Sequence, residues 1–166
     1  MKTTALLLVD SDSTSGALVS QAAAETGHQL IQAHTSHEAF CIIERGLEDV
    51  AAIIIDLDPG VHGLAVLEAI DICATTPPVI VLTGLEEVCM CGIAFARGAA
   101  AWIAKPFSAE KLAEIIEKVI DPAWRLDTYT SDLWGHPHHC RHGAFPCPGC
   151  HPQKLPAPTA LECANL

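Results

Sequence analysis

The sequence predicts an α/β protein: a doubly wound parallel sheet over residues 1–120, followed by an irregular tail over residues 121–166. Three observations predict this organisation. Short apolar runs alternate with helical patterns five times before residue 121. Half of the residues are apolar, so the chain can bury a core of ordinary size. After residue 121 the alternation stops and prolines become frequent. Strands that alternate with helices form parallel sheets with helices on both faces.

The first two repeats are marked by their apolar patterns. Leu6–Val9 is an unbroken apolar run, which is typical of a strand buried on both faces. The Ala-rich segment Ser13–Glu25 predicts a helix, and Gly27 is its stop signal. Leu30–Ala33 predicts a weaker strand. Ser36–Arg45 predicts a second helix that begins at its serine and ends before a glycine.

The third and fourth repeats follow the same alternation. Ala51–Ile55 is rich in β-branched residues and predicts a central strand. Gly63–Cys73 predicts a helix, which a Pro-Pro pair ends before the strand Val79–Leu82. Glu86–Arg97 predicts a helix whose acidic first turn suits the helix dipole, and Gly98 follows its last residue.

The fifth repeat completes the domain. Ala100–Ala104 predicts a strand, and Ser108–Ile120 predicts the last helix. Ser108 is expected to cap this helix, and Glu110 lies in its first turn. The predicted domain therefore occupies residues 1–120.

Polar residues follow four of the predicted strands. They are Asp10, Asp56, Thr83 and Lys105. Ligands of such sheets bind at the carboxyl ends of the strands, so these side chains are expected to converge. A carboxylate can act as a nucleophile, further carboxylates can hold Mg²⁺, and a lysine and a hydroxyl can bind phosphoryl oxygens. Each residue alone fits an ordinary strand end equally well, but four such placements together favour a phosphoryl-transfer site.

These residues resemble the receiver domain of response regulators over residues 5–120. The matching motifs are Val9-Asp10, Ile53-Ile54-Ile55-Asp56, Leu82-Thr83-Gly84, Gly98-Ala99 and Lys105-Pro106-Phe107. The resemblance implies the flavodoxin-like receiver fold, a five-stranded sheet of order 2-1-3-4-5.

The resemblance also implies roles for individual residues. Asp56 would accept a phosphoryl group from a histidine kinase or a phosphotransfer protein. Thr83 would then move toward that group. Trp102 stands where the family has a Tyr or Phe that turns inward, although it also fits an aromatic side chain that packs a helix on the sheet. Lys105 would pair with the phosphoryl oxygens, and its bond to Pro106 is cis in relatives.

Two departures from the family pattern leave the metal site and the phosphorylation open. Relatives have two adjacent acids after the first strand and use them to hold Mg²⁺, whereas here Asp10 is followed by the neutral Ser11. Asp12 would have to turn inward to replace it, and alternation argues against this. Asp58 could serve as the missing ligand, or it would repel the phosphoryl group if no metal were bound. The loop after Asp56 is also one residue shorter than in relatives.

The tail is rich in cysteine and histidine. Cys147 and Cys150 flank a Pro-Gly turn that resembles a zinc knuckle, and Cys140 with His142 would complete a tetrahedral Zn²⁺ site. The same cysteines with the histidine that follows them form a c-type haem attachment motif, but haem attachment takes place outside the cytoplasm. The tail could instead hold an iron–sulfur cluster that includes Cys163, or it could bind no metal at all.

Composition limits the function. The net charge of −11 argues against nucleic-acid binding, and no apolar run is long enough to span a membrane. We see no export signal, so we expect a cytoplasmic protein that is not an enzyme. We expect a stand-alone receiver that switches a surface made by the fourth helix, the fifth strand and the fifth helix, where a partner protein or a second copy binds. The alternative is a phosphorylation-independent receiver, an adaptor with a metal- or redox-responsive tail.

Overall fold

A computed structural model describes residues 4–57, 62–71, 76–84, 94 and 97–121. Its strands are β1 (Ala5–Val9), β2 (Gln29–Ala33), β3 (Val50–Asp56), β4 (Val79–Thr83) and β5 (Ala101–Ala104). Its helices are α1 (Ser13–Glu25), α2 (Ser36–Arg45), α3 (Gly63–Asp71) and α5 (Ala109–Ile120). The helix predicted over Glu86–Arg97 lies mostly outside the described residues, although Ala94 is helical.

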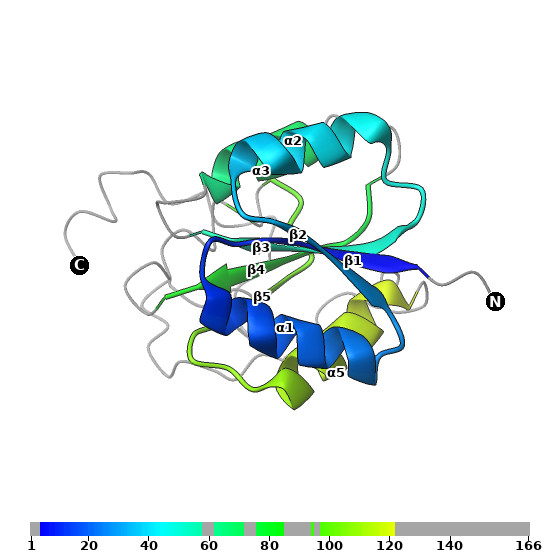
Figure 1. Cartoon of the computed structure of the whole chain (residues 1–166), viewed down its shortest axis with the longest axis vertical. Helices are drawn as coiled ribbons and strands as arrows, with labels where there is room; N and C mark the ends of the chain where they lie inside the picture. Colours follow the sequence, from blue (N-terminus) through cyan, green and yellow to red (C-terminus); the bar gives the residue numbers. More distant parts are fainter. Residues whose placement is uncertain (1–3, 58–61, 72–75, 85–93, 95–96, 122–166) are drawn as a thin grey trace, which may run out of the picture.

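The strands form one parallel sheet in the order β2-β1-β3-β4-β5. Helices α1 and α5 cover one face of the sheet, and α2 and α3 cover the other (Figure 1). The predicted fold class and strand order are therefore confirmed. None of the helices in the described ranges is long and apolar enough to cross a bilayer.

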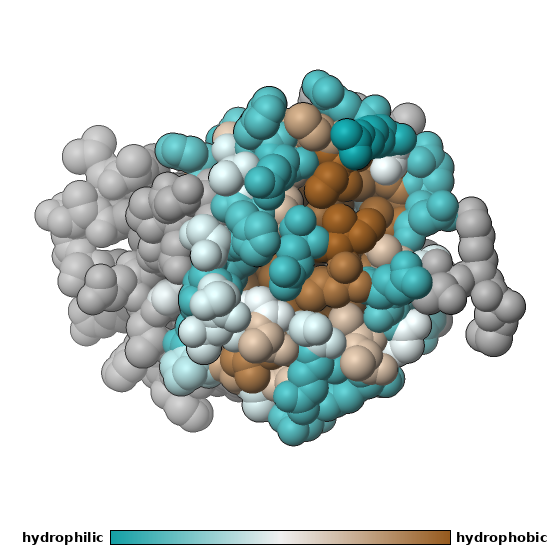
Figure 2. Space-filling model, in the orientation of Figure 1, coloured by the Kyte–Doolittle hydropathy of each residue, from teal (hydrophilic) through white to brown (hydrophobic). Residues whose placement is uncertain are grey.

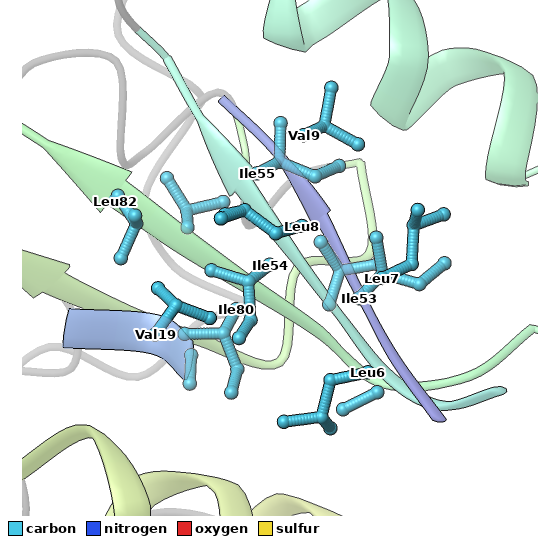
Figure 3. Close-up of a cluster of buried hydrophobic side chains, with 14 of the residues drawn as sticks. Leu6, Leu7, Leu8, Val9, Val19, Ile53, Ile54, Ile55, Ile80 and Leu82 are labelled. Atoms are coloured by element: carbon cyan, nitrogen blue, oxygen red, sulfur yellow. The ribbon is translucent and has the colours of Figure 1, made fainter. Parts of the chain in front are cut away.

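The core is formed where the central strands meet both helical layers. Strands β1 and β4 are buried along their whole length, because helices cover both of their faces. Alternate side chains divide between the two layers. Leu6, Ile54 and Ile80 point toward Val19 of α1, whereas Val9 points toward the opposite layer (Figure 3). Each fully buried Leu or Ile contributes about 1.5–3 kcal/mol to stability.

Capping residues fix where the helices begin. Ser108 caps α5 as predicted, and its hydroxyl accepts from the N–H of Lys111 at 3.2 Å. The helix predicted over Ser36–Arg45 is confirmed by α2, although the residue that caps it lies one position before the serine. Thr35 caps this helix, and its hydroxyl accepts from the N–H of Glu38 at 3.2 Å. The Glu38 carboxylate in turn accepts from the N–H of His34 at 2.7 Å, so the two side chains satisfy two backbone donors at the start of the helix.

Candidate functional site

Four polar residues meet where neighbouring strands end. Asp10 follows β1, Asp56 ends β3, Thr83 ends β4 and Lys105 follows β5. Because all five strands are parallel, their carboxyl ends lie at the same end of the sheet. The N–H of Lys105 donates to the carbonyl of Thr83 at 2.8 Å, which continues the pairing of β4 and β5 beyond the last sheet residue. The structure therefore brings these four predicted residues together.

Lys105 connects the two carboxylates. Its Nζ lies 2.6 Å from Oδ2 of Asp56 and 3.9 Å from Oδ2 of Asp10. The Asp56 side chain is 1% exposed and the Asp10 side chain is fully buried, whereas Lys105 is 20% exposed. Ionised carboxylates are costly to bury without a cation, so Lys105 offsets part of that cost. These three side chains together carry a formal charge of −1, because two carboxylates share one ammonium group.

Asp10 presents one oxygen to this space. Its Oδ1 accepts from the N–H of Asp12 at 2.7 Å. Its Oδ2 is buried and accepts no hydrogen bond within the described ranges. A buried carboxylate oxygen in this state fits a cation ligand, and carboxylate oxygens are what Mg²⁺ prefers. Asp10 and Asp56 therefore provide a donor set that suits Mg²⁺.

The two residues after Asp10 do not add a carboxylate to the site. Ser11 is exposed and neutral. Asp12 caps α1: its Oδ1 accepts from the N–H of Thr14 at 2.9 Å, and its Oδ2 accepts from the Ser15 hydroxyl at 3.3 Å. The backbone hydrogen bond from Thr14 lowers the pKa of Asp12 below its usual value. Asp12 thus binds the start of α1 and does not turn inward, in agreement with the alternation argument.

Thr83 and Trp102 share one face of the sheet. Val81 pairs with Trp102, and Thr83 pairs with Ala104, so all four side chains point to the same side. Ile55 pairs with Val81 and lies on this side as well. Thr83 is fully buried, and Trp102 is 6% exposed. The Trp102 side chain is therefore packed inside the protein, on the same face as the hydroxyl predicted to act as the switch.

The Thr83 hydroxyl is already engaged locally. It donates to the carbonyl of the next residue, Gly84, at 3.0 Å. The peptide bond between Lys105 and Pro106 is cis, as the resemblance implied.

Gly63 supports the phosphoacceptor position, a role that sequence reasoning missed. A Cβ atom at Gly63 would lie 2.2 Å from the carbonyl oxygen of Asp56 and 2.9 Å from Cγ2 of Ile55. No side chain fits in that space, so only glycine lets α3 begin against the end of β3. The signal in the sequence was the glycine itself, which follows Asp56 by seven residues and was predicted only to begin a helix.

Some predicted site residues lie outside the described residues. They are Asp58 and the four tail residues Cys140, His142, Cys147 and Cys150. In the described ranges, no group of three or more His, Cys, Asp or Glu side chains could hold a metal ion. The predicted zinc site is therefore neither supported nor contradicted by the geometry.

Comparisons with known proteins agree with this geometry. The family model described as "Response regulator receiver domain" matches residues 6–117. A comparison with curated proteins gave no significant match. Among solved structures, the receiver domain of NtrX from Brucella abortus is 26% identical, with a TM-score of 0.62, and the match covers 69% of this chain and 97% of that one.

Two further solved structures have the same fold. A putative response regulator from Chloroflexus aurantiacus J-10-fl is 28% identical, with a TM-score of 0.63, and the match covers 72% of this chain and 98% of that one. A response regulator receiver domain protein from Clostridium thermocellum is 24% identical, with a TM-score of 0.66, over 74% of this chain and 98% of that one.

Proposed function

Because this chain belongs to the response regulator receiver family, we propose that it accepts a phosphoryl group on Asp56 and transmits the resulting change as a signal. The observation that carries the proposal is the ion pair of 2.6 Å between Lys105 and the buried Asp56 carboxylate. Beside this pair lies Oδ2 of Asp10, which accepts no hydrogen bond from the part of the chain that the structure describes. A nucleophilic carboxylate, a cation for the phosphoryl oxygens and a ligand for a divalent ion are then all present within one small volume.

The proposed reaction is a phosphoryl transfer from a phosphohistidine. Receiver domains interact with histidine kinases or phosphotransfer proteins, which carry that group. A carboxylate oxygen of Asp56 attacks phosphorus while the bond from phosphorus to the imidazole nitrogen breaks. The bonding electrons stay on the imidazole, which then needs no further reactant from the receiver. The Lys105 ammonium group, which pairs with the Asp56 carboxylate before the transfer, then pairs with the phosphoryl oxygens.

Receiver domains generally bind Mg²⁺ at the phosphorylation site. In this chain Asp10 and Asp56 would hold the ion, and the Ser11 hydroxyl and Asp58 are further candidates. A bound Mg²⁺ would offset the negative charge on the phosphoryl oxygens. Lys105 already supplies one positive charge to the two buried carboxylates, so phosphoryl binding does not depend on the ion alone.

The signal would leave the site through Thr83 and Trp102. A phosphoryl group on Asp56 offers new acceptor oxygens, and the Thr83 hydroxyl would exchange its bond to Gly84 for one of them. Trp102 lies on the same face, so this movement changes its surroundings. We expect the change to reach the surface formed by β5, α5 and the helix predicted between β4 and β5, where a partner protein or a second copy binds.

A second function is favoured by a specific observation. Ser11 is neutral and exposed, so the described site has only two carboxylates for a metal ion. A receiver with this site would act without phosphorylation, as an adaptor whose tail responds to metal or redox state. In that case Cys140, His142, Cys147 and Cys150 would hold Zn²⁺. Under either function we propose a cytoplasmic signalling module that is not itself an enzyme.

Labelling with acetyl phosphate tests the main proposal. We expect the full chain to be labelled in the presence of Mg²⁺ and Asp56→Asn to remain unlabelled, because the amide is not a nucleophile. Labelling that persists in Asp56→Asn would show that another residue is the acceptor. No labelling of the original chain, together with no response to beryllofluoride, would favour the adaptor function.

The zinc content of the tail is tested separately. We expect the double variant Cys147→Ser and Cys150→Ser to lose the zinc that elemental analysis finds in the original chain. Equal zinc content in both proteins would remove the knuckle hypothesis, and it would leave the proposal for Asp56 unchanged. The visible absorption spectrum of protein made with haem-maturation machinery tests covalent haem, because attached haem would give a Soret band.

A further inference from the structure

Strand β2 forms an open edge of the sheet among the described strands. It lies at the front of the molecule between α1 and α2 (Figure 1), where apolar side chains reach the surface (Figure 2). Among the described residues, Ile31 is the large apolar residue that is exposed to solvent, with 38% of its surface accessible. Leu30 is half-buried, and Gln29 and Gln32 are exposed. The strand has no charged residue and no proline, which are the usual devices that prevent an edge strand from pairing with another chain.

The backbone groups that face outward follow from the pairing with β1. Gln29 donates its N–H to the carbonyl of Thr4 at 3.3 Å, and Ala33 accepts from the N–H of Asp10 at 3.1 Å. These residues and Ile31 therefore direct their backbone groups toward β1. The alternate residues, Leu30 and Gln32, direct their N–H and C=O groups away from β1, along the open edge.

We propose that this edge pairs with β2 of a second copy of the chain, in an antiparallel arrangement about a two-fold axis at Ile31. Ile31 then lies opposite Ile31 of the second copy. Leu30 lies opposite Gln32 of the second copy, and Gln32 lies opposite its Leu30. Each of these outer pairs exchanges two N–H···O=C bonds, as hydrogen-bonded pairs of antiparallel strands do. Four backbone bonds join the copies, and the two sheets become one of ten strands.

The two-fold symmetry and the backbone hydrogen bonds already made next to β2 favour this register. A two-fold axis perpendicular to the sheet keeps each side chain on its own face, and residues directly opposite each other must share a face. The axis must therefore lie level with one residue, which then faces its own copy. An axis at Leu30 would pair His28 with Gln32, but the His28 N–H already donates to the carbonyl of Ala23 at 2.8 Å. An axis at Ile31 instead places each outward N–H opposite an outward C=O.

Charge and side-chain contacts also suit a second copy. The chain carries a net charge of −11, but Gln29–Ala33 carries none, so this strand itself adds no charge repulsion between two copies. Ile31 pairs with Leu7 within the sheet and lies on the face covered by α2 and α3. The two isoleucines would meet as a non-hydrogen-bonded pair, in which side chains are closest. Gln32 points to the other face, where its Nε2 would lie 3.2 Å from a Cβ at Gly16.

The dimer is expected to be weak. Pairing over one five-residue strand buries less surface than the roughly 1,600 Å² of a standard interface. We therefore expect a dissociation constant in the micromolar range or above. This inference does not rest on phosphorylation, because it uses the edge of the sheet opposite to β5.

Sedimentation of the full chain at increasing concentration tests the inference. We expect the mass to rise toward twice that of the monomer. Ile31→Lys places two ammonium groups opposite each other, and Gln32→Pro removes one outward N–H while the bonds to β1 remain. Both variants should raise the dissociation constant at least tenfold. Ser20→Lys, which adds the same charge on an exposed position of α1, should leave it unchanged. Far-UV circular dichroism shows that each variant is folded.

Hydrogen exchange identifies the surface that is used. We expect the amides of Leu30 and Gln32 to exchange more slowly as the concentration rises, and to stay fast in Ile31→Lys. A chain that remains monomeric up to about 1 mM would overturn the inference. It would also be overturned by a dimer that both variants leave intact, which would place the interface elsewhere. Slow exchange of these two amides in the monomer would assign the edge to a segment of the same chain.

Discussion

Gly63→Ala is the substitution whose effect the structure defines most sharply. The added Cβ would lie 2.2 Å from the Asp56 carbonyl oxygen and 2.9 Å from Cγ2 of Ile55. Both atoms belong to the end of β3, a buried strand that cannot move away. The clash is with backbone and a core side chain, so α3 must shift by roughly 1 Å for the alanine to fit. The substitution therefore strains the position of the phosphoacceptor itself.

The expected cost follows from two opposing terms. Overpacking of this kind costs about 1–3 kcal/mol, and replacing glycine by alanine in a helix returns at most about 1 kcal/mol. We expect a net loss of about 1–2 kcal/mol, which lowers the melting temperature of a domain this size by roughly 4–8 °C. Displacement of the Asp56 backbone should also weaken beryllofluoride binding about tenfold, since a shift of 1 Å in a site can cost as much as a hundredfold.

Gly16→Ala is the matched control. A Cβ at Gly16 in α1 would lie 3.2 Å from Nε2 of Gln32, the far end of a flexible side chain. This helix interior position should gain up to about 1 kcal/mol from the alanine. Thermal unfolding followed by circular dichroism, with beryllofluoride titration of each variant, compares the two substitutions. If Gly63→Ala were as stable as the original chain and bound the analogue equally well, the close contact between α3 and β3 would be refuted.

Three further predictions concern the carboxylates and their neighbours. Ser11→Asp should tighten Mg²⁺ binding at least tenfold, because a carboxylate about 4 Å from a divalent ion gains about 2 kcal/mol even in water. The affinity can be measured by a Mg²⁺ titration followed through Trp102 fluorescence, with Trp124 and Trp134 replaced. An unchanged affinity would show that position 11 faces away from the ion. Asp10→Asn should raise the free energy of unfolding in EDTA by about 1 kcal/mol, because it removes a buried carboxylate whose Oδ2 accepts no hydrogen bond within the described ranges. A urea titration in which this variant is less stable than the original chain would contradict the expected gain in stability. The same substitution should abolish Mg²⁺ binding. Asp12→Ala should lower the melting temperature, and Asp12→Asn should retain most of it because asparagine also caps helices. The pKa of Asp12 is lowered in the folded protein, so its contribution is complete above the unfolded pKa and is lost as pH falls through the folded value. The difference between the original chain and Asp12→Ala should therefore shrink in acid, and a constant difference would disprove the capping role of the charge.

The sequence predicted the sheet well because burial on both faces leaves a plain trace. Leu6–Val9 and Val79–Leu82 are continuous apolar runs, and the structure buries both strands on either side. The weaker signal over Leu30–Ala33 has a physical cause as well. This strand is at the edge of the sheet, where most of its residues are at least partly exposed, so a mixed composition suffices.

The site residues could be found because parallel strands bring their ends together. Once the strands were placed, the four polar residues that follow or end them had to lie at the same end of the sheet. They are Asp10, Asp56, Thr83 and Lys105. The contact of Gly63 with Asp56 could not be found in this way, because it depends on the angle at which α3 meets β3. The residue that caps α2 could not be identified for a different reason. Thr35 and Ser36 are adjacent hydroxyl residues, both suited to capping, and only the reciprocal bonds of Glu38 select Thr35.

The phosphoacceptor site and the open edge are joined by one strand. The N–H of Asp10 donates to the carbonyl of Ala33 at 3.1 Å, so the residue that presents its Oδ2 to the site also fixes the end of β2. The other site residues, Asp56, Thr83 and Lys105, lie on the side of β1 away from β2. A second copy on β2 would therefore leave the face of β5 and α5 open to a partner. The two surfaces are also connected through α1, which contacts both β2 and α5, so any free-energy coupling between them has two structural routes.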